Sequence, residues 1–253
     1  RNITKKTKAI IIVHFLGKPV EIEKIKYLKR KYKLVIIEDA AEAHGAIYKN
    51  KKVGSIGDLS CFSFYANKII TSGEGGMICT NKKSYKDKIN LYKNLGFTMP
   101  RFKHFINGYN FRMTAIQAAL GNSQLSKIEN TIKTKVTIAN RYIDNLKTIS
   151  EIDLPQKSNN ERNVFWQFGI RINSRLHIKN KLVKYLKKNG IDTRSFFFSI
   201  RNQPSLINFI PKKVPKTPNS NLLWEQGLYL PSSHDITNKE IDFICKKIKE
   251  FFQ

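Results

Sequence analysis

The chain has 253 residues, 41% of them hydrophobic and 11% aromatic, so it can form one large or two modest domains with a packed core. Its 46 Lys and Arg against 19 Asp and Glu give a net charge of +27, but the basic residues are spread along the chain without an arginine–aromatic cluster. A basic patch must be localised to indicate nucleic-acid binding, so we expect no specific nucleic-acid partner and favour a small anionic substrate such as a nucleotide diphosphate.

The cysteines and the apolar runs predict a cytoplasmic protein. The apolar run 9–16 is short, contains His14 and lacks a small-residue cleavage site, so it predicts a buried strand rather than a signal peptide. No run approaches the ~20 apolar residues of a membrane helix, so we expect no membrane partner. Cys61, Cys79 and Cys245 lie far apart without a CxxC pair, which indicates buried thiols in a reducing compartment and no metal site.

The first part of the chain predicts alternating strands and helices. A strand over 9–14 precedes a helix that starts at Pro19. The run 33–39 is apolar up to two acids, which predicts a strand buried on both faces, as in a parallel sheet. Short strands over 58–65 and 75–80 then flank a glycine-rich turn.

The middle of the chain is predicted to be helical. A helix over 82–96 is closed by Gly96, and a capping box at Thr114 and Gln117 opens a long apolar stripe. This stripe predicts one long helix, or a kinked pair near Gly121, that bridges two domains.

The last part predicts a smaller α+β unit. Strands over 164–172 and 190–197 surround a helix over 177–189, and a final helix begins at Thr237, whose capping box is completed by Glu240. We therefore predict an α/β domain with a mainly parallel sheet over 1–125 and a smaller α+β domain over 126–253 that includes the bridging helix.

Three polar residues lie where an α/β sheet gathers ligands. Asp39 ends one strand, and Lys68 follows another, with Ser63 five residues before it. Pyridoxal phosphate (PLP) needs an amine, a carboxylate for its ring nitrogen and donors for its phosphate. Each residue also fits an ordinary role, Asp39 as a turn residue and Lys68 as a solvated side chain. Thr71 and Ser72 fit polar contacts to a cofactor or simple turn capping.

Four ordered segments carry a resemblance: "EDAAEAHGA", "FSFYANKIITSGEGGM", "GYNFRMTAIQAALG" and "GIDTRSFF". They resemble the signatures of the DegT/StrS-type nucleotide-sugar aminotransferases. The resemblance implies the fold-type I PLP-enzyme architecture and a homodimer with shared active sites. It also implies that Lys68 forms the Schiff base, Asp39 pairs with the pyridine nitrogen, Ser63 holds the phosphate and Glu42 lies beside the ring hydroxyl. Glu42 departs from the glutamine that many members carry.

The same resemblance implies substrate contacts. Asn110 would reach the cofactor phosphate of the partner subunit, and Arg112 would lie near the phosphates of the substrate. Arg194 fits a substrate phosphate or a strand end. His44 fits the site, but a satisfied structural histidine is favoured. Trp166 and Trp224 are expected in the core.

Within the family, Glu42 and the segments around Lys68 and Asn110 are most similar to members that make perosamine from GDP-4-keto-6-deoxymannose, with L-glutamate as donor. A UDP- or dTDP-linked keto sugar is the alternative substrate. Family members carry roughly a hundred further residues before this point, including a phosphate-binding turn at a helix N-terminus. We therefore expect an incomplete large domain that binds PLP poorly, or an inactive remnant with nonspecific affinity for polyanions.

Overall fold

The computed structural model describes residues 2–100, 102–156, 158–173, 176–210 and 216–253. The chain forms two compact units, residues 1–132 with 158–166 and residues 133–157 with 167–253, and the division falls within helix α4. The strands are β1 (Ala9–Val13), β2 (Val35–Asp39), β3 (Ile47–Tyr48), β4 (Lys51–Lys52), β5 (Leu59–Ser63), β6 (Gly76–Cys79), β7 (Ile152–Asp153), β8 (Glu161–Arg162), β9 (Phe168–Ile172), β10 (Arg194–Ser195) and β11 (Gly227–Leu230). The helices are α1 (Ile22–Tyr32), α2 (Lys83–Lys93), α3 (Ala115–Leu125), α4 (Ile128–Leu146), α5 (Leu176–Lys188), α6 (Pro218–Gln226) and α7 (Asn238–Phe252).

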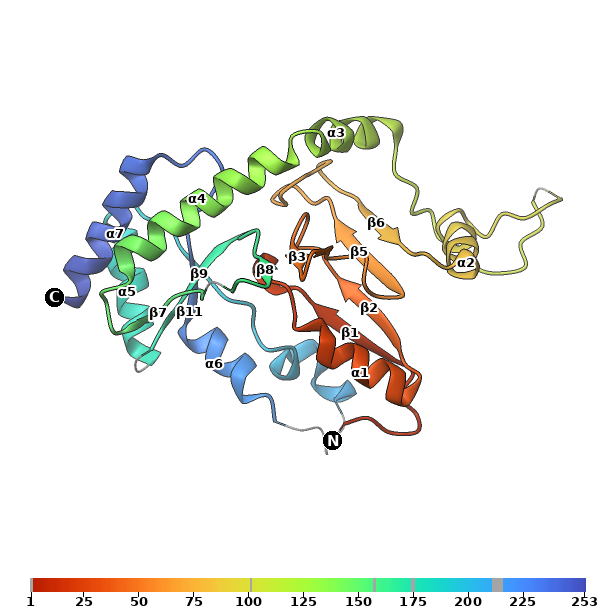
Figure 1. Ribbon diagram of the computed structural model, residues 1–253, viewed down its shortest axis with the longest axis horizontal. Coiled ribbons are helices and arrows are strands. Elements are labelled where there is room, and N and C mark those ends of the chain that lie inside the picture. The colour runs from red at the N-terminus through yellow and green to blue at the C-terminus, as the bar shows by residue number, and fades with distance from the viewer. Residues whose placement is uncertain (1, 101, 157, 174–175, 211–215) are drawn as a thin grey trace. The chain divides into compact units, whose positions relative to one another are not determined.

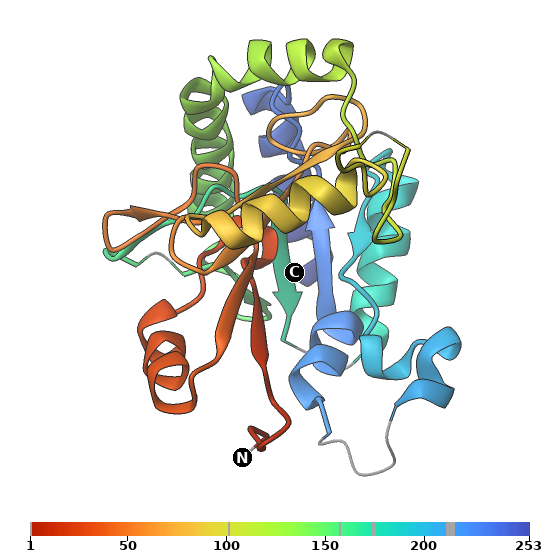
Figure 2. The same ribbon diagram turned by 90° about the vertical axis from the view of Figure 1, so that its right-hand side faces the viewer.

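The first unit is built on a four-stranded sheet in the order β1-β2-β5-β6 (Figure 1). Strands β1, β2 and β5 are parallel, and β6 returns antiparallel to β5, so the predicted mainly parallel sheet is confirmed. Figure 2 shows β1 and β2 running side by side. A small sheet of β4, β3 and β8 completes the unit.

One face of the main sheet is covered and the other is open. Ile12 of β1 and Ile36 of β2 pack with Ile22 of α1 in a buried cluster. On the opposite face, Ile11 is 66% exposed and Val13 is 47% exposed. In β2 itself Ile36 and Glu38 are buried, while Val35, Ile37 and Asp39 on the other face are half-buried, so the predicted burial of this strand holds fully on the α1 side only.

Local signals located the main strands and helices of this unit but not the short strands β3, β4 and β8, and two predicted helices differ in detail. Helix α1 begins at Ile22 rather than Pro19, because the Val20 N–H is bonded to the His14 ring and Glu21 occupies the N-cap. The other difference is the break in the predicted long helix.

The capping box at Thr114 is confirmed, but the helix continues through Gly121. It breaks between α3 and α4, where the Ser126 hydroxyl donates to the Ser123 carbonyl at 2.8 Å. Ile116 and Leu120 of the predicted apolar stripe are exposed.

The second unit has an antiparallel sheet in the order β10-β11-β9-β7, which confirms a smaller α+β unit. Figure 2 shows β9 and β11 pointing in opposite directions. The predicted strands 164–172 and 190–197 shorten to β9 and the two-residue β10. The predicted helix over 177–189 is α5, and the capping box at Thr237 starts α7, whose Ile241, Ile244 and Ile248 are buried.

The three cysteines differ in how deeply they are buried. Cys245 is buried, as predicted, but Cys61 and Cys79 are only half-buried because they lie on neighbouring strands of the half-open sheet. Within the described residues, each helix is too short or too polar to cross a membrane. The His, Cys, Asp and Glu side chains of this part of the chain form no group of three or more that could hold a metal ion.

The Asp58 carboxylate connects α1 and β2 to the start of α2 through three polar contacts. It accepts hydrogen bonds from Ile36 N–H at 2.9 Å and Lys29 Nζ at 2.7 Å, and lies 2.8 Å from Lys82 Nζ. Burial alone would raise the pKa of Asp58, but these three partners outweigh it and lower the pKa from 3.8 to about 2. A carboxyl group with a lowered folded pKa stabilises the fold above its ordinary pKa and loses that contribution as the pH falls through the folded value.

We therefore expect the free energy of unfolding to fall by about 2 kcal/mol more in the parent than in Asp58→Asn as the pH drops from about 5 to about 2. Urea denaturation at each pH measures this difference. The asparagine cannot titrate, so equal pH dependence in both proteins would contradict the assignment.

Candidate active site

The carboxyl ends of β2 and β5 form the edge on which the predicted site residues lie. These strands are parallel neighbours, and the Cα of Asp39 pairs with that of Cys61. Because side chains alternate along a strand, Asp39, Cys61 and Ser63 share one face of the sheet. This is the more open face, whereas Glu38 and Ser60 are fully buried on the other. Asp39 and Ser63 are therefore brought together at one edge and on one face.

The loop after β5 closes on itself and carries Lys68. Phe64 N–H donates to the Gly75 carbonyl at 2.9 Å, and Ser72 N–H donates to the Phe64 carbonyl at 3.0 Å. The Thr71 hydroxyl donates to the Phe64 carbonyl, and the Ser72 hydroxyl donates to the Glu74 carbonyl. Of the two roles expected for these hydroxyls, the structure shows turn capping.

The loop requires a glycine at its end. Gly75 has φ +132°, and a Cβ there would lie 2.7 Å from the Met113 side chain. The backbone conformation is the reason for glycine here, because the Met113 methyl group is the end of a flexible side chain and can move.

The Lys68 amine is enclosed by an acid and an aromatic ring. Its Nζ lies 4.0 Å from the Glu42 carboxylate and 3.9 Å from the centre of the Trp166 ring, and the side chain is 10% exposed. Burial lowers the pKa of Lys68 from 10.5, while the charges of Glu42 and Asp39 oppose this. The neutral amine, which is the form able to act as nucleophile or base, is therefore more populated than in a solvated lysine.

Trp166 is a site residue that sequence reasoning placed only in the core. It is buried at 6% exposure, but its ring faces the Lys68 amine and its Nε1 donates to the Asn67 carbonyl at 2.8 Å. The only signal in the sequence is that a buried indole N–H requires an acceptor, and that rule does not say which acceptor it finds.

Glu42 is held by the backbone as well as by Lys68. Its Oε2 accepts a hydrogen bond from Leu16 N–H at 2.8 Å. Burial raises the pKa of Glu42, against the lowering effects of this N–H and of the Lys68 charge. The carboxylate that faces the amine is thus fixed on one oxygen and free to interact with the amine through the other.

Replacing Glu42 with glutamine is expected to lower the pKa of Lys68. Glutamine can still accept from Leu16 N–H, but it removes the negative charge that favours the ammonium form. An opposite charge at this distance typically changes a pKa by 1 unit or more, so the pH midpoint for amine acetylation of Lys68 should fall by about 1 pH unit. Peptide mass spectrometry measures the midpoint, and the exposed Lys147 in the same samples is the reference. An unchanged or higher midpoint would contradict the electrostatic role of Glu42.

His44 is buried near Lys68 and packs against two phenylalanine rings. Its ring centre lies 5.3 Å from that of Phe62 and 5.9 Å from that of Phe64, and neither ring nitrogen makes a well-formed hydrogen bond within the described residues. Burial and the Lys68 charge lower its pKa to about 4, against a hydrogen bond with the Ser63 backbone that raises it, so the ring is neutral at neutral pH. The ring thus has a weak backbone contact with Ser63 and no well-formed side-chain partner among the described residues, so its role as a structural or a site histidine stays a prediction.

The three remaining predicted residues lie elsewhere. Asn110 forms a backbone bridge with Asn94, and Arg112 Nη1 donates to the Asn94 side chain at 2.8 Å. Both side chains are exposed, and their partner here is the C-cap of α2 rather than Lys68. Arg194 is exposed on β10 in the second unit, where it pairs in register with Tyr229.

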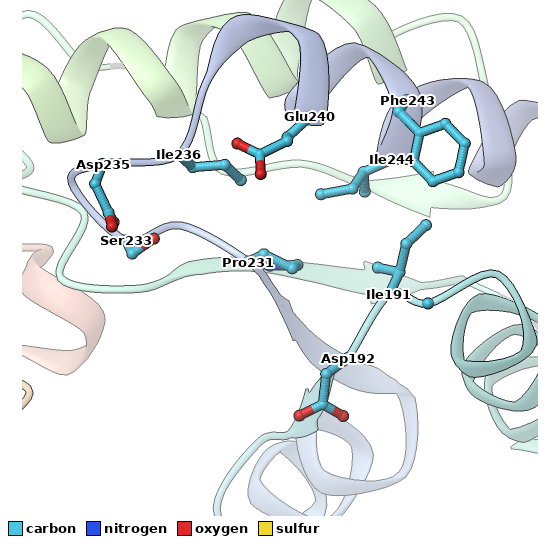
Figure 3. Close-up of a pocket in the computed structure, with 10 residues that line it drawn as sticks. Ile191, Asp192, Pro231, Ser233, Asp235, Ile236, Glu240, Phe243 and Ile244 are labelled. Carbon is cyan, nitrogen blue, oxygen red and sulfur yellow. The ribbon is translucent and has the colours of Figure 1, made fainter.

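The second unit contains a separate cavity of about 310 Å³ between the start of α7 and the residues that precede β10 (Figure 3). Ile191, Phe243 and Ile244 supply its apolar lining, and Asp192 and Glu240 supply carboxylates. Glu240 is already engaged in the capping box of α7. Among the residues that the structure describes, the lining has no lysine, histidine or cysteine side chain, so the Lys68 group is the stronger candidate site.

The structure thus combines a mainly parallel sheet with an enclosed lysine beside the carboxyl ends of its strands, which is the arrangement of an α/β protein with a candidate lysine site. The sequence model of the DegT/DnrJ/EryC1/StrS aminotransferase family matches residues 1–249. The chain is 36% identical over 253 residues to GDP-perosamine synthase of Escherichia coli O157:H7, covering 100% of this chain and 68% of that protein. GDP-perosamine synthase of Vibrio cholerae is 35% identical over 254 residues, with the same coverage.

Among solved structures, Helicobacter pylori PseC, an aminotransferase involved in the biosynthesis of pseudoaminic acid, matches with a TM-score of 0.90 and 28% identity. The match covers 99% of this chain and 68% of PseC. The chain belongs to the DegT/DnrJ/EryC1/StrS family of PLP-dependent sugar aminotransferases. The resemblance carried by the four sequence segments is thereby confirmed.

The geometry of the site is suited to the cofactor of this family. The Lys68 amine is partly desolvated, and Asp39 and Ser63 share the more open face of the sheet. An amine, a carboxylate and a hydroxyl are the groups that PLP requires.

Proposed function

We propose that this protein transfers the amino group of L-glutamate to a nucleotide-linked 4-keto-6-deoxy sugar, with PLP as cofactor and GDP-4-keto-6-deoxymannose as the favoured substrate. The observation that carries the proposal is the Lys68 amine, enclosed by Glu42 and Trp166 and lowered in pKa by burial. The sequence identity of 36% and 35% to two GDP-perosamine synthases supports the choice of a GDP-linked sugar.

In this proposal the residues around the sheet edge hold the cofactor. Lys68 is the covalent attachment point, Asp39 pairs with the ring nitrogen, Ser63 binds the phosphate and Glu42 lies beside the ring hydroxyl. When bound, PLP supplies an electron-withdrawing ring that stabilises negative charge at the carbon bearing the amino group. Lys68 Nζ takes and returns the proton at that carbon, and its lowered pKa keeps a neutral fraction available for this step.

The remaining residues are assigned to substrate and partner. Arg112 and Arg194 bind the phosphates of the nucleotide, which suits a chain with a net charge of +27. His44 contributes a neutral ring to the substrate side of the site. Asn110 reaches the cofactor phosphate of a second copy, so the active form is a cytoplasmic homodimer with shared sites.

Reductive trapping tests the cofactor site. The full chain is mixed with PLP, reduced with borohydride and digested, and the modified peptide is identified by mass spectrometry. We expect one modified residue, Lys68. Modification scattered over exposed lysines, or none, would contradict the proposed site.

The substrate is tested by comparing nucleotides. GDP-, UDP- and dTDP-linked 4-keto-6-deoxy sugars are supplied separately with PLP and glutamate, and amino-sugar formation is measured by mass spectrometry. We expect the highest rate with the GDP sugar. A higher rate with a UDP or dTDP sugar would replace the favoured substrate. No amino transfer, together with salt-labile binding to a polyanion, would favour the inactive remnant.

A further inference from the structure

A tight turn, residues 14–17, holds both neighbours of the Lys68 amine. Leu16 adopts the left-handed conformation with φ 56° and ψ 18°. Its N–H donates to Glu42 at 2.8 Å, and its carbonyl accepts from Trp166 N–H at 3.1 Å. Through its N–H and its carbonyl, Leu16 therefore contacts the Glu42 carboxylate and the Trp166 backbone, and these are the two residues that enclose the Lys68 amine.

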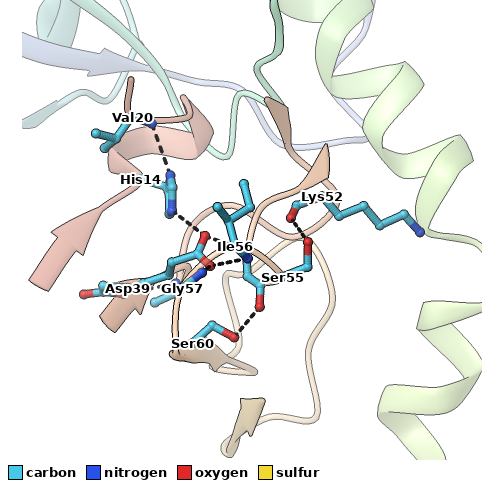
Figure 4. Close-up of polar contacts among 11 residues, drawn as sticks. His14, Val20, Asp39, Lys52, Ser55, Ile56, Gly57 and Ser60 are labelled. Carbon is cyan, nitrogen blue, oxygen red and sulfur yellow. Dashed lines mark hydrogen bonds and ion pairs between the residues drawn. The ribbon is translucent and has the colours of Figure 1, made fainter. Parts of the chain in front are cut away.

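His14 locks this turn to β2 (Figure 4). Its ring is fully buried, and its Nδ1 accepts from Val20 N–H at 3.2 Å, so the proton lies on Nε2, which donates to Glu38 at 3.2 Å. The His14 N–H also donates to the Asp39 carbonyl at 3.0 Å. The turn is thus attached to the strand end that carries Asp39.

The backbone of the turn at Gly17 lies close to the segment that contains Val164 and Trp166. Gly17 has φ +91°, and a Cβ there would lie 2.7 Å from the Val164 side chain and 3.1 Å from Trp166 N. Val164 N–H donates to the Gly17 carbonyl at 3.2 Å. A residue with a side chain at position 17 would separate the two segments.

We propose that the turn 14–17 is the positioning element of the lysine site, in which Leu16 and His14 hold Glu42 and Trp166 against the Lys68 amine. The turn touches Asp39, Glu42 and Trp166 through hydrogen bonds, while Leu16 contributes only its backbone to these contacts. The inference rests on the proposed function only in treating Lys68 as the reacting amine.

The experiment compares Leu16→Val with Leu16→Asn in a Trp224→Phe background, which leaves Trp166 as the single tryptophan. A β-branched residue strongly disfavours the left-handed conformation, whereas asparagine tolerates it, so the two variants lose the same side chain but differ in the backbone. No cofactor is added. The readouts are acrylamide quenching of Trp166 fluorescence and the pH midpoint for acetylation of Lys68, with Lys147 as reference.

In Leu16→Val we expect the quenching constant of Trp166 to rise about threefold, because opening the turn exposes a buried indole. The Lys68 midpoint should rise by about 0.5 pH unit, because the loss of burial, the largest effect on this pKa, outweighs the opposite effect of loosening Glu42. Leu16→Asn should match the parent in both readouts. If Leu16→Val does not fold, Leu16→Ala makes the same comparison with a milder conformational penalty.

Unchanged quenching and an unchanged midpoint in a folded Leu16→Val or Leu16→Ala protein would overturn the proposal. Equal changes in the asparagine variant would also overturn it, because the Leu16 side chain would then be the cause. Since neither readout requires PLP, a failure of amino transfer leaves this test intact.

Discussion

Replacing Lys68 with arginine is expected to abolish the borohydride-trapped PLP adduct and amino transfer. Arginine keeps a positive charge beside Glu42 and Trp166 but cannot form a Schiff base, and it stays protonated at any working pH. Loss of the general acid–base group alone typically costs on the order of 10²–10⁴-fold in rate. Mass spectrometry of the trapped peptides and the amino-sugar assay measure the two effects.

Lys179 provides a matched control in the second unit. It is also buried and also lies near an indole, with Nζ 5.4 Å from the centre of the Trp224 ring, but it donates to the Trp224 carbonyl at 2.8 Å. A lysine whose amine is committed to such a bond should take up no PLP, and Lys179→Arg should leave trapping at Lys68 unchanged. Amino transfer that persists in Lys68→Arg would remove Lys68 from the mechanism.

Replacing Glu38 with alanine is expected to be the most destabilising single change, at about 3–5 kcal/mol. The fully buried carboxylate accepts from Gly54, Ile56 and Gly57 N–H groups at 2.8, 2.8 and 2.5 Å, and from His14 Nε2 (Figure 4). Alanine would leave these partly buried backbone donors and the buried His14 ring without an acceptor, and each such group is costly. Chemical denaturation measures the loss.

Glu23→Ala is the control for this prediction. Glu23 is half exposed on α1 and pairs only with Lys26 at 3.4 Å, so its loss should change stability by no more than about 0.5 kcal/mol. If Glu38→Ala lowers the free energy of unfolding no more than this control does, the prediction that the Glu38 carboxylate holds the 54–57 loop is wrong.

Local pattern was enough to locate much of the first unit. Strands β1, β2, β5 and β6 follow from apolar runs of strand length, and the helix starts at Thr114 and Thr237 follow from capping boxes. These features depend on neighbouring residues, which is why they can be read before any tertiary contact is known. The family was also accessible, because four ordered segments carry it.

The enclosure of Lys68 could not be read in the same way. Glu42 was recognised by resemblance, but the ring against the amine is Trp166, which is distant in the sequence and was expected only to fill the core. His44 was placed near the site, but the phenylalanine rings of Phe62 and Phe64 that pack against it belong to another segment of the chain. Which groups surround a side chain is decided by segments that meet only in the fold.

The sequence by itself determined the family of the protein, the main strands and helices of the first unit, and the lysine that is the candidate for its chemistry, since these are recorded in residue type and short-range spacing. The tertiary structure alone decided that one face of the sheet is open, that the long helix breaks after Leu125, and that the Leu16 turn joins Glu42 to Trp166. The physical reason is the same in each case. Burial and hydrogen-bond partners are set by pairing between distant segments, and an apolar run has the same letters whether one face or both faces are covered.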